Sequence, residues 1–391
     1  MSATLQTLEE IKRLTSPFPE STAVKQWKAQ GKKVMGWVCI YVPEELIYAA
    51  DMLPFRITSD NEELELKKAE AYLYSNSCSF SRTCLQLSLD GNFEFLDGVT
   101  TAETCDGTRR LHDAWLRYKR FPFMHTFYIP RKFTERARQL YLTELEEWRA
   151  ELAAFRGAEI TDDELRRAIQ IYNRGRELLQ KLYELRKREY PPVTGAETLE
   201  IIKAAMRLPR ARFNELMEQL LDEVERTGRE IHKRTRLMVL GSCLTNSTWI
   251  ESIESLDAVV VTDELCTGTR YFWERVDTSL PPMEALARHY LNRPPCARFQ
   301  PFERRFEHIF SMVDQYKVHG VVSEIVRYCV SYGHDKPLLK ERLDHRDIPV
   351  LELDVEYGQR GSGQVRIRAE AFVEMLQTKH FSALSAAREA S

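Results

Sequence analysis

The sequence lacks two features that would have fixed a functional class at once. No run approaches 18 consecutive apolar residues in its 391 positions, so we expect no membrane-spanning segment. Net charge is almost absent, because 56 basic and 59 acidic side chains give −3 at pH 7. A protein that mainly neutralises nucleic-acid phosphates needs a basic excess, so we expect no nucleic-acid binding. The first residues show no secretory pattern, which predicts a cytoplasmic protein.

Two motifs are also missing. Without Cys-x-x-Cys, zinc-ribbon and ferredoxin-type sites are excluded, and any metal cluster must be assembled by the tertiary structure. Without Gly-x-x-x-x-Gly-Lys-Ser/Thr, this chain is not expected to hydrolyse ATP. Disulfides are not expected in a cytoplasmic protein. The spacing of the cysteines alone favours the interpretation that they are buried thiols that pack in the core. The eight cysteines are 39, 78, 84, 105, 243, 266, 296 and 329.

The composition, with 43% apolar and 29% charged residues, is that of a globular protein. At about 150 residues per domain, the length corresponds to two or three domains. Short apolar runs alternate with helical patterns in the first and last thirds, which predicts α/β lobes with parallel sheets. These runs lie at 33–39, 53–57, 95–101, 124–129, 236–240, 258–262, 320–326 and 348–355.

The middle of the chain has a purely helical pattern. Thr161 and Glu164 form a capping-box sequence that predicts a helix over 162–188. A second helical pattern, 196–228, is broken near Pro209. We therefore predict three parts: an N-terminal helix with the first α/β lobe (1–133), a helical segment (134–232), and a second α/β lobe with a C-terminal helix (233–391).

The two predicted lobes resemble each other, as in flavodoxin-like or Rossmann-like folds. Val34 to Cys39 has the outline of Met238 to Cys243, and each run is followed by a helix and a second strand. Cys105 and Cys329 each follow a predicted strand by a few residues. Ligands of open α/β sheets bind beyond the carboxyl ends of the strands, so facing lobes would bring these two cysteines to one cleft.

Four stretches together carry a family resemblance that runs from about residue 30 to 378. The chain resembles the benzoyl-CoA reductase / 2-hydroxyacyl-CoA dehydratase family in these stretches. They are Gly36-Trp-Val-Cys-Ile-Tyr-Val-Pro-Glu-Glu-Leu-Ile-Tyr-Ala-Ala50, Thr104-Cys-Asp-Gly-Thr-Arg-Arg110, Asp263-Glu-Leu-Cys-Thr-Gly-Thr-Arg270, and Gly363-Gln with Arg366 and Ala369-Glu-Ala-Phe372.

The resemblance implies a two-lobed subunit with a 4Fe-4S cluster on three cysteines, which match Cys78, Cys105 and Cys329. The fourth iron position would be open to a CoA-thioester substrate. It also implies a sister cluster subunit or a second copy of this chain, and a separate ATP-hydrolysing iron–sulfur activator that supplies electrons. The product would be a dearomatised CoA thioester or, through a ketyl radical, an enoyl-CoA. We favour benzoyl-CoA-type ring reduction, with 2-hydroxyacyl-CoA dehydration as the alternative.

Other residues leave further alternatives open. Cys266 and Cys296 resemble the pattern of a sister group whose double-cubane cluster reduces small molecules, and Cys266 is therefore a fourth candidate ligand. A non-catalytic subunit that kept the fold is a third hypothesis. His334, five residues after Cys329, is a candidate proton donor. Glu45, at the start of a predicted helix, is either a catalytic carboxylate or a partner of the helix dipole.

Overall fold

The computed structural model describes residues 4–60, 64–357 and 363–389. Its first sheet has four parallel strands in the order β2-β1-β3-β4. Strand β1 lies between β2 and β3, with Met35 opposite both Pro54 and Gly98. The strands are β1 (Val34–Val38), β2 (Leu53–Arg56), β3 (Gly98–Glu103) and β4 (Phe123–Tyr128).

The second sheet repeats this arrangement, with four parallel strands in the order β6-β5-β7-β8. Its strands are β5 (Thr235–Gly241), β6 (Ala258–Glu264), β7 (Gly320–Val326) and β8 (Val350–Val355). The same parallel order in both sheets confirms the prediction of two similar α/β lobes. In both, the carboxyl end of the third strand along the chain leads to a candidate cluster cysteine.

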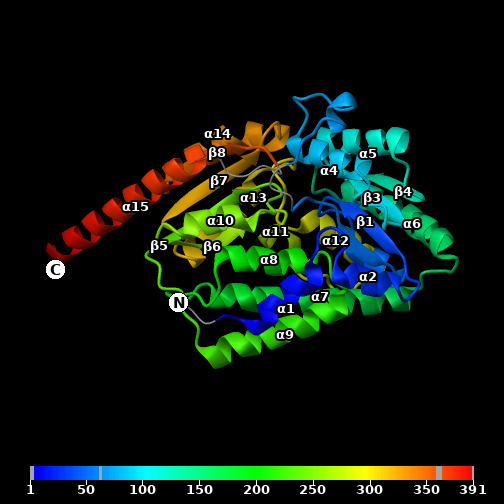
Figure 1. The fold of residues 1–391 in the computed structure, drawn as a ribbon, viewed down its shortest axis with the longest axis horizontal. Helices are drawn as coiled ribbons and strands as arrows, with labels where there is room; N and C mark the ends of the chain where they lie inside the picture. The colour runs from blue at the N-terminus through cyan, green and yellow to red at the C-terminus, as the bar shows by residue number, and fades with distance from the viewer. Residues whose placement is uncertain (1–3, 61–63, 358–362, 390–391) are drawn as a thin grey trace.

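Helices cover both sheets (Figure 1). In the first lobe they are α1 (Gln6–Thr15), α2 (Thr22–Lys28), α3 (Glu44–Ala49), the 3₁₀ turn η1 (Ala69–Ala71), α4 (Ser79–Leu89) and α5 (Asp106–Tyr118). In the second lobe they are α10 (Ser247–Glu254), α11 (Thr269–Phe272), α12 (Pro282–Asn292), α13 (Glu303–Gln315), α14 (Val330–Asp344) and α15 (Gly363–Glu389).

Four helices separate the two sheets in the sequence: α6 (Glu135–Arg156), α7 (Asp162–Leu185), α8 (Gly195–Ala205) and α9 (Arg210–Thr227). The predicted capping box is present, because Thr161 Oγ1 accepts from the Glu164 amide at 3.2 Å and Glu164 accepts from the Thr161 amide at 2.8 Å. Pro209, at the N-cap of α9, separates α8 from α9. Helix α7 contacts α3 of the first lobe and α11 and α12 of the second.

One apolar core runs through all three predicted parts of the chain. It includes Leu8 of α1, Trp148 and Leu182 of the central helices, and Val321 of β7. Helix α1 is fastened to α9, because Glu223 accepts hydrogen bonds from the amides of Gln6 at 2.7 Å and Thr7 at 2.9 Å. The division into 1–133, 134–232 and 233–391 stays a prediction. Within the described ranges, no helix is long and apolar enough to cross a bilayer.

Candidate functional site

Three cysteines from distant parts of the chain line one cavity of about 490 Å³. Cys78 and Cys105 come from the first lobe, and Cys329 comes from the second. Each is partly buried. The tertiary structure thus brings together the residues that the sequence resemblance selected, although 224 positions separate Cys105 from Cys329 in the chain.

Each of these cysteines occupies the N-cap position of a helix: Cys78 of α4, Cys105 of α5 and Cys329 of α14. The amino ends of three helices therefore converge on the cavity. Unpaired amides and the positive end of the helix dipole favour negative charge at such positions. The helix ends therefore favour thiolates at these positions, against the burial that favours neutral thiols.

The turn at Cys105 is built by local contacts. Cys105 Sγ accepts a hydrogen bond from the Thr108 amide at 3.5 Å, and Thr108 Oγ1 accepts one from the Cys105 amide at 3.4 Å. Gly107 leaves the space that this packing needs, because a Cβ there would lie 2.9 Å from Ser81 Oγ and 3.2 Å from Cys78 Cβ. The glycine thus lets the α5 turn approach the α4 turn closely.

Two of the three thiols have raised pKa values, which favours their protonated forms. Burial raises the pKa of Cys78 to about 11, and the nearby Cys105 adds to the rise. Burial also raises the pKa of Cys329, and Cys78 is the next largest cause. A metal cluster needs deprotonated sulfur, so its binding here has to release these protons.

The donor set fits an iron–sulfur cluster better than a single ion. Among the described residues, no three His, Cys, Asp or Glu side chains lie close enough together to hold one metal ion. The thiolates around a cubane stand further apart than the ligands of one ion, and soft sulfur donors select such clusters. Three thiols that line one cavity at three helix ends provide such soft sulfur donors.

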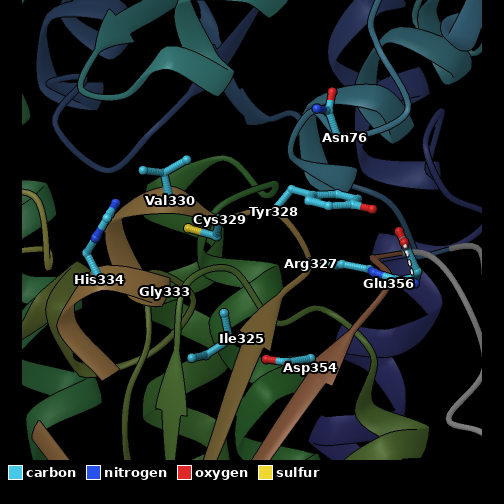
Figure 2. A pocket seen from close by; sticks show the side chains of 10 residues that line it. All are labelled: Asn76, Ile325, Arg327, Tyr328, Cys329, Val330, Gly333, His334, Asp354 and Glu356. Carbon is cyan, nitrogen blue, oxygen red and sulfur yellow. Dashed lines mark hydrogen bonds and ion pairs between the residues drawn. The ribbon is translucent and has the colours of Figure 1, made fainter. Parts of the chain in front are cut away.

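A second, larger cavity of about 680 Å³ adjoins the first and shares Asn76, Tyr328, Cys329 and Val330 with it. Figure 2 shows Cys329 between Tyr328 and Val330 above the end of β7, with Asn76 across the cavity. His334 lies one turn further along α14, where its exposed side chain lines this cavity. The candidate proton donor and the candidate ligand therefore share one wall.

A buried ion-pair network holds α14 behind this wall. Asp335, next to His334, pairs with Arg305 of α13. Arg305 donates two hydrogen bonds to Glu264, at 3.1 and 2.8 Å, and Arg270 pairs with the same carboxylate at 2.7 Å. Arg305, Arg270 and Glu264 are almost completely buried, so the network fixes α14 to the end of β6.

Glu45 lies outside both cavities, fully buried in helix α3. Its carboxylate accepts hydrogen bonds from Arg176 of α7 and from Tyr290 Oη at 2.7 Å. Burial acts to raise the pKa of Glu45, but Arg176 and the Tyr290 hydrogen bond outweigh it and hold the pKa below the ordinary value. In this structure Glu45 joins the lobes to the helical segment.

Cys266 also lies apart from the cavity of Cys78, Cys105 and Cys329. It follows β6, and its sulfur accepts a hydrogen bond from Arg270 at 3.4 Å. Burial raises its pKa to about 12, against the opposing charge of Arg270, and Cys296 and Cys243 are among its neighbours. Cys266, Cys243 and Cys296 therefore form a second group of thiols outside that cavity, and Cys296 is close enough to Cys329 to contribute to the rise in its pKa.

Sequence reasoning missed two residues of the site. Arg298 lines the cysteine cavity, and only its place two positions after Cys296 could have pointed to it. Tyr328 lines both cavities and has a φ of 63°, a left-handed conformation that is rare outside glycine. No local pattern of residue types indicates such a backbone angle in advance.

Comparison with known proteins gives one consistent result. The family described as "2-hydroxyglutaryl-CoA dehydratase, D-component" matches residues 39–376. A benzoyl-CoA reductase subunit of Thauera aromatica is 27% identical, over 90% of this chain and 92% of the relative. The (R)-phenyllactyl-CoA dehydratase beta subunit of Clostridium sporogenes is 23% identical, over 92% and 96%. The beta subunit of the (R)-2-hydroxyglutaryl-CoA dehydratase of Acidaminococcus fermentans is 25% identical, over 94% and 98%.

Proposed function

Because this chain belongs to the 2-hydroxyglutaryl-CoA dehydratase D-component family, we propose that it is the iron–sulfur subunit of an ATP-dependent enzyme that reduces or dehydrates a CoA thioester. The thiolates of Cys78, Cys105 and Cys329 hold a 4Fe-4S cluster. The observation that carries the proposal is the convergence of these thiols, each at a helix N-terminus, on one cavity. The family membership agrees with the resemblance seen in the sequence.

When bound, such a cluster supplies low-potential one-electron reduction and an open iron position beside three thiolates. The chain itself holds the thiolates and directs three helix N-termini at them. The larger cavity receives the thioester end of the substrate, because its wall includes Cys329. His334, on the same wall, is the candidate donor of a proton to the substrate there.

Electrons have to come from a partner. The sequence has no phosphate-binding Gly-x-x-x-x-Gly-Lys-Ser/Thr loop, so ATP is hydrolysed by a separate iron–sulfur activator. A sister cluster subunit or a second copy of this chain completes the enzyme; the relatives named above are likewise subunits. The isolated chain is expected to turn over no CoA thioester until these partners are added.

Ring reduction of a benzoyl-CoA-type substrate is the reaction we favour, and the reductase subunit among the relatives supports it. Dehydration of a 2-hydroxyacyl-CoA is the second candidate, which the dehydratase subunits support. An assay of the assembled enzyme with both thioesters, ATP and the activator separates the two. Loss of the aromatic absorption of the acyl group indicates reduction, and formation of an enoyl-CoA indicates dehydration.

The cluster assignment is tested by counting iron and acid-labile sulfide on anaerobically purified protein. We expect about four irons per chain. Cys105→Ser and Cys329→Ser should each lose more than half of the iron, whereas Cys39→Ser, which alters a thiol outside the cavity, should keep it. Full iron content in Cys105→Ser would contradict the assignment. A count near eight that falls in Cys266→Ser would favour the double-cubane alternative.

A further inference from the structure

A segment of the second half of the chain is anchored to the first lobe. In residues 293–300, the Cys296 amide donates to Tyr41 Oη at 3.2 Å, and the Phe299 ring stacks on the Tyr41 ring with centroids 4.6 Å apart. The Gln300 amide donates to the Arg131 carbonyl at 3.0 Å. Arg298 therefore extends from a backbone that is fixed on both sides.

From this position Arg298 reaches the loops of two cluster cysteines. Its Nε donates to the carbonyl of Thr104 at 2.8 Å, directly before Cys105. Its Nη1 donates to Ser331 Oγ at 3.4 Å, two residues after Cys329. One guanidinium thus joins the Cys105 turn of the first lobe to the Cys329 turn of the second, and it lines the cavity between them.

The positive charge of Arg298 is not balanced by a carboxylate. Within the part of the chain that the structure describes, Arg298 makes no ion pair, whereas Arg110 at the same cavity pairs with Asp106 at 3.5 Å. Arg298 is also partly buried, while Arg110 is 57% exposed. A half-buried guanidinium is less screened by solvent than an exposed one, so its charge acts more strongly on the groups around the cavity.

Resting on the proposed function, we propose that Arg298 is a positioning residue that sets the Cys105 turn against the Cys329 turn, and that its charge offsets the negative charge of the bound thiolates. The bridge adds a side-chain link between the two lobes at the cavity, beside the hydrogen bond from the Ser79 amide to the Arg327 carbonyl at 3.2 Å. The charge stabilises the reduced form of the bound group, which carries one more electron.

The bridge is tested on the metal-free protein by amide hydrogen exchange. Loss of a hydrogen bond from a charged donor should speed exchange about tenfold in residues 103–108 and 327–333 of Arg298→Gln. Ser331→Ala removes one end of the bridge and should speed exchange only in 327–333. Arg304→Gln is the matched control, because Arg304 donates to the Asn292 carbonyl at 2.8 Å and stacks over Phe133, outside the cavity. Equal exchange in Arg298→Gln and Arg304→Gln would overturn the bridge.

The charge is tested by redox titration of the iron-reconstituted variants. Arg298→Gln should shift the reduction equilibrium about tenfold toward the oxidised form, which is about 59 mV for one electron. Arg298→Lys keeps the positive charge, but its side chain cannot bond to both Thr104 and Ser331. Amide hydrogen exchange in this variant should therefore be as fast as in Arg298→Gln, while the reduction potential should stay at the wild-type value. Equal shifts in the Lys and Gln variants would overturn the charge effect. If the wild type binds no iron, the proposed function fails, and the exchange experiment still decides the bridge.

Discussion

The two lobes share a strand order but hold their cysteines in different ways. Cys105 closes a capping box with Thr108, so its turn is built from four consecutive residues. Cys329 has no such cap, follows Tyr328 with its φ of 63°, and begins a helix that contains Pro337. The Cys329 turn depends instead on distant contacts, including the bond from the Ser79 amide to the Arg327 carbonyl at 3.2 Å. Two lobes of the same topology therefore hold their cysteine turns differently: neighbouring residues hold the turn at Cys105, and contacts from distant residues hold the turn at Cys329.

A second difference between the lobes lies five residues before Cys105 in the first lobe and five residues before Cys329 in the second. Thr100 of β3 and Glu324 of β7 occupy matching strand positions, and both are buried. Each has a side-chain oxygen without a hydrogen-bond partner among the described residues, but only Glu324 is acidic. At this strand position the second lobe thus carries a buried carboxyl group where the first has a hydroxyl, and this carboxyl group should make the stability of the protein depend on pH.

The largest difference between the lobes should come from the ion pairs beside each cysteine helix. Arg305→Ala leaves Asp335 and part of Glu264 unpaired in the interior, so the free energy of unfolding should fall by about 3–5 kcal/mol. Arg110→Ala, which breaks exposed pairs on α5, should change it by at most about 1 kcal/mol. Denaturant unfolding measures both. Similar losses in the two variants would mean that α14 is not held by its network.

The buried Glu324 predicts a pH effect. Burial raises its pKa from 4.5 to about 8. Between these values the folded protein keeps a proton that the unfolded chain releases, so the free energy of unfolding falls as pH rises and levels off above pH 8. Glu324→Gln cannot titrate and so does not lose stability in this way. Relative to the wild type, its free energy of unfolding should rise by on the order of 1 kcal/mol or more between pH 5 and 8. The neighbouring thiol, Cys243, is present in both the wild type and the variant, so the comparison isolates Glu324. Parallel pH profiles would show that Glu324 reaches water.

The capping difference predicts a smaller effect in metal-free protein. Cys105→Ala removes the acceptor of the Thr108 amide and should destabilise the fold by about 1 kcal/mol. Cys105→Ser should recover that loss, since serine is a favoured N-cap residue. Cys329→Ala removes no cap and should cost less. Melting temperatures of the three variants decide the matter, and a larger loss at 329 than at 105 would reverse the comparison.

The smallest effect concerns the backbone before each cysteine. At position 328 glycine should be more stable than alanine by about 0.5–1 kcal/mol, because the left-handed conformation is costly for any residue with a Cβ. At the matching Thr104, which has no positive φ, alanine should be the more stable by a similar amount. Comparing Gly with Ala at each site cancels most of the lost side-chain contacts. The same order at both positions would show that Tyr328 is unstrained.

The lobes could be predicted because their signals are local. Apolar runs of strand length and the Thr161 capping box depend on neighbouring residues, and the observed strands and α7 lie where they predict. Boundaries are less exact: the pattern predicts a strand at 95–101, but β3 begins at Gly98, because Phe95 and Leu96 are buried in the preceding turn. Packing against a neighbour, which ends a strand, leaves little trace in the local pattern.

The sequence predicted those residues of the site that the family resemblance implied, and it did not predict the others. Cys78, Cys105 and Cys329 line one cavity, and His334 borders the next, yet local spacing alone would have left the cysteines as packing residues and His334 as a surface or capping residue. Arg298 acts through contacts 194 and 33 positions away in the chain, which no local pattern encodes. The surroundings of Glu45 show the same limit, because Arg176 and Tyr290 join it from distant helices.

The fastening of α1 to Glu223 also has a consequence during synthesis. A ribosome that adds about 5–20 residues per second needs about 10–40 s to make the 217 residues between Gln6 and its acceptor. Until then Leu8, Ile11 and Leu14, which the finished protein buries, have no α8 or α9 to pack against. Helix α1 is therefore synthesised well before the helices that bury its apolar stripe, and this stripe is open to chaperones throughout that interval.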